Sequence, residues 1–402
     1  MRNCDQNQGV AIIGGGIIGL FAGYLLLEKG YQVTIFEKES AAGENLSSLK
    51  IGDNVYVDRL YHHIFPQNRV LLSFISELGL ADELVWRKNQ TGIVINDRPL
   101  LLNSFSDLLK SYDLSLTGKY KYMIFLLRSL YVRNWKKFDK ISVHQLIENN
   151  CGAEIWKKVF HPVLKGKFHD SASSISAAWF YKKLQQRAKC RTIGSGERLG
   201  AFKKSSKVLV DRLSGKIREK GGTILTGSRV EKLKIKNQRF YGLSVNGKNY
   251  DFDRLIITTP IPEIINLFSS ELTNINDEVT SLKSIEYAHS LCTLVRLKKE
   301  LSGFYWLFVR DEQSPFFLIV EHTNLIKSET CNDEHVVYLA RYVTSCEELY
   351  SKSDKEIFDN DFCHLQEIFS HISNKDIINY SVTRIPYAQP IFKSALLRAC
   401  CT

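Results

Sequence analysis

The first forty residues alternate between short apolar runs and a helical pattern. Val10–Ile13 is apolar and rich in β-branched residues, which predicts a strand buried on both faces of a parallel sheet. Leu20–Lys29 predicts a helix that ends at Gly30, and Gln32–Phe36 predicts a second strand. This strand–helix–strand order is typical of an α/β fold.

Similar patterns recur later in the chain. Residues 61–194 are rich in helical patterns, whereas residues 266–392 alternate as the strands of an antiparallel sheet do. The other predicted strands are Asn54–Val57, Thr223–Leu225, Arg229–Ile235, Asp253–Thr259, Ala288–Lys298, Phe304–Arg310, Phe316–His322 and Val336–Tyr342. The other predicted helices are Val208–Lys220 and Asp354–Ser370.

A glycine motif joins the first strand to the first helix. It comprises Gly14, Gly15, Gly16, Ile17, Ile18 and Gly19. In such a motif Gly14 permits the tight turn, Gly16 lets the backbone approach a pyrophosphate, and Gly19 allows close packing of helix on strand. Glu37 ends the second strand, where a carboxylate accepts hydrogen bonds from a ribose. Together these features predict a dinucleotide site.

Charge and composition narrow the class of protein. The 402 residues include 54 Lys and Arg against 43 Asp and Glu, a net charge of +11 that favours anionic partners. A hydrophobic content of 44% excludes wholesale disorder. The apolar run Met123–Val132 is interrupted by Arg128, so we expect no membrane span. The nine cysteines show no metal-binding spacing, and we expect no metal site and no nucleic-acid binding.

Several segments resemble the FAD-dependent amine oxidase and protoporphyrinogen oxidase superfamily, in particular a bacterial group of its oxidoreductases. They are VAIIGGGIIGLFAGYLLLEKGYQVTIFEKE, LYHHIF, WRKNQTGI, VLKGKFHDSASSISAAWF, LVDRLSGKIREKGGTILTGSRVEKL, LIITTP, VEHTNLI and RIPYAQPIF. The resemblance implies a discontinuous Rossmann-like FAD-binding domain and a mixed α+β substrate domain. The implied boundaries are 8–60 and 195–265 for the FAD domain, 61–194 for a helix-rich cap, 266–392 for the sheet of the substrate domain, and 393–402 for a divergent tail.

The resemblance also implies which further residues bind FAD. Besides the glycine motif and Glu37, these are Lys38, Gly43, Val230 and Thr259. For Val230 and Thr259 the alternative is ordinary strand packing.

Two adjacent histidines, His62 and His63, are the candidate catalytic residues, since a histidine can move a proton near neutral pH. The resemblance places their segment beside the flavin ring, and UDP-galactopyranose mutases have a similar His-Ile-Phe there. Because adjacent strand residues face opposite ways, we expect only one of the pair to face the ring. The alternative is a pair of structural histidines.

Four further residues are candidates for binding an anionic substrate: Arg59, Arg341, Tyr342 and Tyr387. Arginine forms bidentate hydrogen bonds with carboxylate or phosphate groups. The alternative for each arginine is an ordinary surface position, where most arginines lie. The run from Glu321 to Asn324 resembles the strand end that faces the family's active-site cavity.

The sequence departs from the family pattern at three places. Ala41 and Glu44 stand where the family has Arg and Gly, and Lys204-Ser205 replaces a Gly-Gly pair. The third departure is the tail 393–402, which matches nothing in the family's C-terminal flavin-binding segment. All three affect flavin contacts, so we expect weaker FAD binding on a preserved fold.

Three functions follow as hypotheses. The first is an FAD-dependent oxidoreductase that moves a hydride from an anionic small molecule to the flavin. The second is a non-redox flavoenzyme like UDP-galactopyranose mutase, and the third is an inactive, flavin-poor member. We expect a cytoplasmic protein, with peripheral contact at the inner membrane surface left open; the sequence leaves its oligomeric state open as well.

Overall fold

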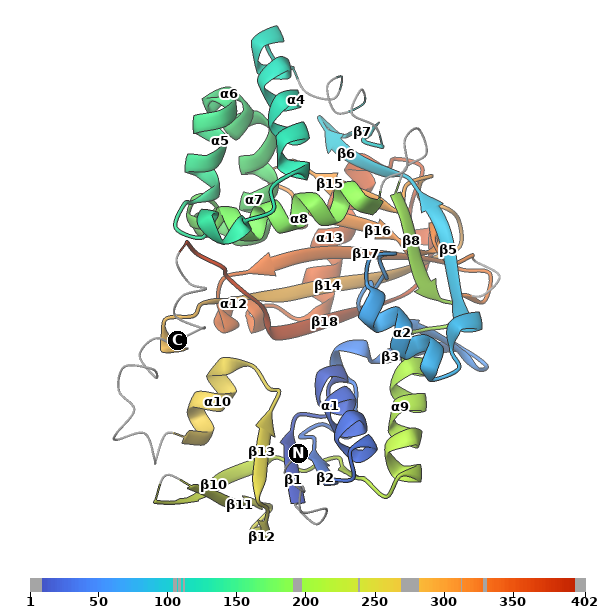
Figure 1. The fold of residues 1–402 in the computed structure, drawn as a ribbon. Coiled ribbons are helices and arrows are strands. Elements are labelled where there is room, and N and C mark those ends of the chain that lie inside the picture. Colours follow the sequence, from blue (N-terminus) through green and yellow to red (C-terminus); the bar gives the residue numbers. More distant parts are fainter. Residues whose placement is uncertain are drawn as a thin grey trace.

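The structure is a computed structural model. It describes residues 9–103, 107, 110, 113–190, 197–237, 239–268, 282–311, 313–327 and 331–394. Within these ranges the strands form a parallel sheet, a large mixed sheet and three smaller sheets, and a group of consecutive helices gathers in a block at one end (Figure 1).

The parallel sheet has the strand order β13-β1-β2-β9. Its strands are β1 (Gly9–Ile13), β2 (Gln32–Phe36), β9 (Thr223–Leu225) and β13 (Arg254–Ile257). Helices α1 (Ile17–Glu28) and α9 (Lys207–Glu219) share one apolar core with β1 and β2. The antiparallel sheet β10 (Val230–Lys236), β11 (Arg239–Val245) and β12 (Lys248–Asp251) packs through a second core that includes Ala11 and Phe36. The predicted α/β unit is therefore confirmed, built from two separate stretches of the chain.

The large mixed sheet has the order β18-β14-β17-β16-β15-β6-β7. Its strands are β6 (Thr91–Ile95), β7 (Arg98–Leu101), β14 (Tyr287–Leu297), β15 (Trp306–Val309), β16 (Leu318–Glu321), β17 (His335–Val343) and β18 (Ile377–Pro390). Helix α13 (Asp354–Ile368) packs through Phe358, Phe362 and Leu365 on one face of this sheet. All neighbouring strands are antiparallel except β6 and β15.

The helical block lies at the opposite end of the molecule from the parallel sheet (Figure 1). Its α-helices are α4 (Leu116–Leu130), α5 (Val143–Cys151), α6 (Ala153–Ile155), α7 (His161–Phe168) and α8 (Ala177–Cys190). Tyr122, Phe125, Phe160 and Tyr181 belong to their common core, which also contains Ile93 of β6 and Ala288 of β14. The block is thus anchored on the mixed sheet.

Smaller elements complete the described chain. These are η1 (Glu44–Leu46), β3 (Ser48–Gly52), β4 (Val55–Asp58), α2 (Arg69–Glu77), η2 (Ala81–Glu83), β5 (Leu84–Asn89), η3 (Trp135–Phe138), η4 (Trp156–Phe160), η5 (His169–Ser174), β8 (Glu197–Phe202), α10 (Ile261–Phe268), η7 (His322–Asn324), α12 (Cys346–Tyr350) and η9 (Asn374–Asp376). Strand β3 pairs with β4, and β5 pairs with β8.

Several features differ from the predicted elements, among them strands β3, β8, β11 and β12, which were not predicted. Helix α1 begins at Ile17 rather than Leu20, because the last turn of the glycine motif is already helical. The stretch 61–194 also contains strands β5 to β7, two of which extend the mixed sheet. Strand β18 was not predicted, although its residues belong to the family-like RIPYAQPIF segment. Of the tail 393–402, residues 395–402 lie outside the described ranges.

Among the described helices, none combines the length and the apolar character needed to cross a membrane.

Candidate functional site

The glycine motif forms a tight turn from β1 into α1. Gly14 has φ +108°, a backbone conformation that disfavours residues with a Cβ atom. Gly16 is the N-cap residue of α1 and offers no side-chain cap to the first amide groups of the helix. Those amides are therefore available to an anion, whose charge the helix N-terminus favours.

The other glycines of the motif have distinct packing roles. A Cβ atom on Gly19 would lie 1.9 Å from the carbonyl oxygen of Gly14, and one on Gly15 would lie 2.8 Å from Cβ of Glu37. A Cβ atom on Gly16 would meet nothing within 4 Å. Gly15 and Gly19 are therefore needed for packing, whereas Gly16 leaves open space beside the helix N-terminus.

This space belongs to a cavity of about 350 Å³, here called the nucleotide cavity. It lies at the carboxyl ends of the parallel strands, where open α/β sheets bind their ligands. Most of the predicted cofactor residues line it, namely Gly14, Gly16, Ile17, Ile18, Glu37, Lys38, Gly43, Val230 and Thr259. Gly15 and Gly19 lie behind this lining and shape the turn.

Glu37 is buried at the end of β2. Its carboxylate accepts hydrogen bonds from the backbone N–H of Gly15 at 2.7 Å and of Glu39 at 2.9 Å. The carboxylate is thereby fixed beside the glycine turn, and each of its oxygens retains a second lone pair for a ligand hydroxyl.

The positive groups of the nucleotide cavity lie at its rim and are paired. Lys38 lies 3.9 Å and Arg229 3.5 Å from the carboxylate of Glu263. Thr259, in contrast, has a buried hydroxyl oxygen for which the described residues supply no hydrogen-bond partner. Such an orphaned polar atom at a cavity wall suits a polar ligand atom.

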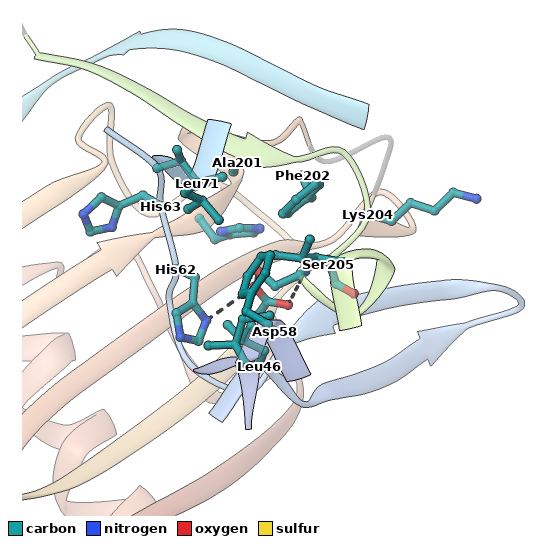
Figure 2. A pocket seen from close by; sticks show the side chains of 15 residues that line it. Leu46, Asp58, His62, His63, Leu71, Ala201, Phe202, Lys204 and Ser205 are labelled. Carbon is teal, nitrogen blue, oxygen red and sulfur yellow. Dashed lines mark hydrogen bonds and ion pairs between the residues drawn. The ribbon is translucent and has the colours of Figure 1, made fainter. Parts of the chain in front are cut away.

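A second cavity of about 260 Å³, here called the inner cavity, shares Ile17 and Leu46 with the nucleotide cavity. Its wall is largely apolar. The polar side chains on it come from Asp58 at the end of β4, from His62, His63 and His322, and from Lys204, Ser205 and Ser206 (Figure 2). The two cavities are thus neighbours along one wall.

Asp58 organises the polar side of the inner cavity. Its carboxylate accepts hydrogen bonds from the N–H and the hydroxyl of Ser206 at 2.8 and 2.7 Å. The same carboxylate lies 3.5 Å from Nδ1 of His62, which points toward it in Figure 2. Asp58 was not among the predicted site residues; its place directly after a strand and four residues before His62 was the available signal.

Both predicted histidines line the inner cavity. Residues 61–63 form no strand, so strand alternation does not decide which of the two would face a flavin ring, and that expectation stays a prediction. Burial, with a smaller effect from Arg187, lowers the pKa of His63 to about 3. Burial also lowers the pKa of His322 to about 4. Both rings are therefore neutral at pH 7.

The pair that replaces Gly-Gly, Lys204-Ser205, is accommodated without filling the cavity. The hydroxyl of Ser205 bonds that of Ser48 at 3.0 Å, and the Lys204 side chain is exposed and extends away from the other labelled residues (Figure 2). The side chain of Glu44, another departure, lies outside the described residues.

The four predicted substrate residues do not come together. Arg59 is exposed and lines neither cavity. Arg341 points to the other face of the sheet, where its guanidinium pairs with the buried carboxylate of Asp361 on α13. Tyr387 lines the nucleotide cavity instead of the inner one, with φ +57°. Tyr342 alone lies near the residues described next.

A cationic cluster that the sequence analysis did not single out lies between the helical block and the mixed sheet. Here it is defined as Lys167 on α7 with Lys183 and Arg187 on α8. The Lys167 ammonium lies 5.4 Å from the ring centre of Tyr342, and the Arg187 guanidinium lies 4.6 Å from that of Trp306. The His63 ring in turn lies 4.7 Å from Trp306. The cluster therefore adjoins the inner cavity through these rings.

Burial and mutual repulsion disfavour the charged form of Lys167 in this cluster. Burial, together with the charges of Lys183 and Arg187, lowers the pKa of Lys167 to about 7. Among the described residues, neither lysine of the cluster makes an ion pair. Cations gathered in this way gain most from an anionic ligand.

Taken together, the residues present fit a dinucleotide that extends toward the inner cavity. The carboxylate of Glu37, the open side of Gly16 and the unpartnered hydroxyl of Thr259 all line one space.

Comparisons of the sequence with known proteins agree with this arrangement. The profile of a family described as flavin containing amine oxidoreductase matches residues 18–384. Over 175 residues the chain is 30% identical to mitochondrial protoporphyrinogen oxidase of Nicotiana tabacum, an alignment covering 42% of this chain and 34% of that protein. The aligned part thus spans about a third of the tobacco protein's length.

Solved structures share the fold. An oxidoreductase from Methanosarcina mazei aligns with a TM-score of 0.74 at 17% identity, over 95% of this chain and 90% of that one. Reduced UDP-galactopyranose mutase aligns with a TM-score of 0.74 at 14% identity, over 98% of this chain and 86% of the mutase. At these identities the likeness is one of fold.

Proposed function

The chain belongs to the family of flavin-containing amine oxidoreductases, with FAD as its cofactor, and we propose that it oxidises an anionic small molecule by hydride transfer. The observation that carries the proposal is the contact between the two cavities, which share Ile17 and Leu46. One cavity has the features of a nucleotide site, and the other has the histidines.

The residues that would hold the cofactor follow from the lining of the nucleotide cavity. Glu37 would accept hydrogen bonds from ribose hydroxyls, and the backbone around Gly16 would face the pyrophosphate. When bound, FAD supplies the oxidising capacity, since its ring system accepts a hydride from a substrate C–H bond. The protein contributes position and electrostatics.

We assign the movement of the accompanying proton to His62. Its imidazole lies on the wall of the inner cavity, and its Nδ1 lies 3.5 Å from the carboxylate of Asp58 without a hydrogen bond to it. The nearby carboxylate would favour the protonated ring that forms when His62 takes up the proton. His63 and His322, being neutral, would contribute hydrogen bonds and shape to the cavity instead of charge.

The cationic cluster supports an anionic substrate. Lys167 and Arg187 present their charges over Tyr342 and Trp306, and His63 on the inner cavity wall touches the same Trp306 ring. A substrate with a flat or apolar body would pack on these rings while its carboxylate or phosphate group met the cations.

The test begins with the purified chain reconstituted with FAD under anaerobic conditions. Candidate acids are added alongside their neutral methyl esters, and bleaching of the flavin absorbance reports hydride transfer. We expect an acid to bleach the flavin and its ester to do so poorly. Equal reduction by both would overturn the anionic substrate class while leaving the oxidoreductase assignment intact.

A matched pair of lysine variants sharpens the test. Lys182 neighbours Lys183 on α8, but its ammonium lies 5.2 Å from the Trp135 ring, and it is not part of the cluster. We expect Lys167→Gln to raise KM by about 10- to 100-fold, the loss of one charge-assisted hydrogen bond, and Lys182→Gln to leave KM unchanged. Equal effects of the two variants would contradict the role of the cluster.

A non-redox isomerase on the same fold gives a different result. Such an enzyme, once reduced with dithionite, would turn over a UDP-sugar without any electron acceptor. Turnover of that kind, with no acceptor-dependent oxidation, would replace the proposed function.

A further inference from the structure

We propose that α4 is a membrane-binding helix that lays one face on an anionic lipid bilayer. Its face turned to solvent carries large apolar side chains, with Leu116 85%, Tyr120 63% and Leu127 51% exposed. Leu130 is 46% exposed, and Tyr131, the C-cap residue, is 81% exposed. This surface, here called the α4 stripe, goes beyond the proposed redox function.

The stripe is continuous along the helix. At about 100° per residue, its members fall within an arc of about 100°. The buried residues of α4 lie on the opposite side: Gly118, Tyr122, Phe125 and Ser129. One face of the helix therefore holds the block together, and the other presents an apolar surface to solvent with no described element upon it. Surface helices of soluble proteins normally carry polar residues at such positions.

The charges around the stripe identify its partner. Residues 114–138 contain six basic and no acidic residues. Lys121 and Arg128 are exposed on α4, and Arg133, Lys136 and Lys137 are exposed directly after it. An amphipathic helix with aromatic and leucine side chains on one face and basic residues beside it is suited to the interface of an anionic membrane.

The position of α4 is compatible with this docking. The helix lies at the outer end of the helical block, at the opposite end of the molecule from the parallel sheet (Figure 1). A bilayer could therefore contact the stripe without covering the nucleotide cavity. Since no described helix can cross a membrane, the contact would be peripheral.

The test is sedimentation of the full chain with vesicles of phosphatidylcholine alone or with about 30% phosphatidylglycerol. We expect binding to the anionic vesicles that weakens as salt is raised, and little binding to the neutral ones. The double variant Leu116→Gln, Leu127→Gln should lower the partition coefficient by on the order of tenfold for each leucine. Lys136→Gln with Lys137→Gln should lower it by roughly fivefold per lysine.

Val70 on α2 provides the matched control, because it is 74% exposed but lies outside the stripe. Val70→Gln should bind anionic vesicles as the wild type does, and circular dichroism melting should verify that every variant is folded. Equal binding to both vesicle types, or unchanged binding of the leucine variant, would overturn the proposal. So would a dimer, detected by light scattering, that the leucine variant abolishes, because a second copy would then cover the stripe.

Discussion

Two glycines three residues apart in the same motif should respond in opposite ways to substitution. Gly16→Val adds carbon atoms where a Cβ would meet nothing within 4 Å, in a position that lines the nucleotide cavity. We expect a loss of stability of no more than about 1 kcal/mol, typical of an unfavourable N-cap residue. FAD affinity, in contrast, should fall sharply, because the valine side chain would keep the pyrophosphate away from the backbone.

The magnitude follows from the hydrogen bonds that the valine side chain would prevent. A hydrogen bond from a backbone N–H to a charged phosphate contributes about 1.5–3 kcal/mol. Loss of two such bonds at the start of α1 amounts to about 3–6 kcal/mol, or roughly two to four orders of magnitude in the dissociation constant. Titration of the FAD-free variant with FAD, followed by flavin fluorescence, measures this directly.

Gly19→Ala provides the contrast. Its Cβ would lie 1.9 Å from the Gly14 carbonyl oxygen, so helix α1 must move away from the turn. We expect destabilisation of about 3 kcal/mol, at the upper end for overpacking, measured by urea denaturation. A folded Gly16→Val protein that binds FAD as tightly as the wild type would refute the assignment of the backbone around Gly16 to the pyrophosphate. A Gly19→Ala protein of wild-type stability would refute the reasoning about the packing.

Further predictions concern buried charge and protonation. Arg341→Met leaves the buried carboxylate of Asp361 without its cation, so the free energy of unfolding should fall by about 3–5 kcal/mol while FAD affinity stays unchanged; a parallel loss of FAD affinity would contradict a purely structural role. Because the pKa of His322 is about 4 in the folded protein and about 6.5 in the unfolded chain, the unfolded chain binds more protons between these pH values. The free energy of unfolding of the FAD-free protein should therefore fall by about 3 kcal/mol from pH 7 to pH 4 because of His322, and by a similar amount because of His63. Urea denaturation of His322→Phe should show a smaller fall over this pH range, and an unchanged fall would argue against burial of His322 as the cause. Since the pKa of Lys167 is about 7, KM for an anionic substrate should rise as the pH is raised from about 6 to 8.5, and Lys167→Gln should abolish that part of the pH profile.

The nucleotide half of the site could be predicted because its chemistry is local in sequence. The turn from Gly14 to Gly19 and the acid Glu37 lie within one strand–helix–strand unit, and the spacing of the motif alone brings them together. Short apolar runs likewise predicted β1 and β2, and the apolar pattern of residues 266–392 predicted β14 and β17, since each of these strands is buried along most of its length.

The rest depends on contacts between distant segments. Asp58 and Ser206 are 148 positions apart, and only the packing of β4 against the start of α9 joins them. Arg341 was misjudged because the phase of a strand decides which face a side chain occupies, and no nearby motif fixes that phase. The cationic cluster joins α7 and α8 to the rings of β15 and β17, so no local pattern could reveal it.

We expect the chain to build a working flavin site despite its departures at Ala41, Glu44, Lys204 and Ser205. Titration of the purified 402-residue protein with FAD, followed by removal of free cofactor and a visible absorbance spectrum, tests this expectation most directly. The expected result is a yellow protein with one FAD bound per chain. A folded protein that stays colourless after added FAD is washed away would contradict it.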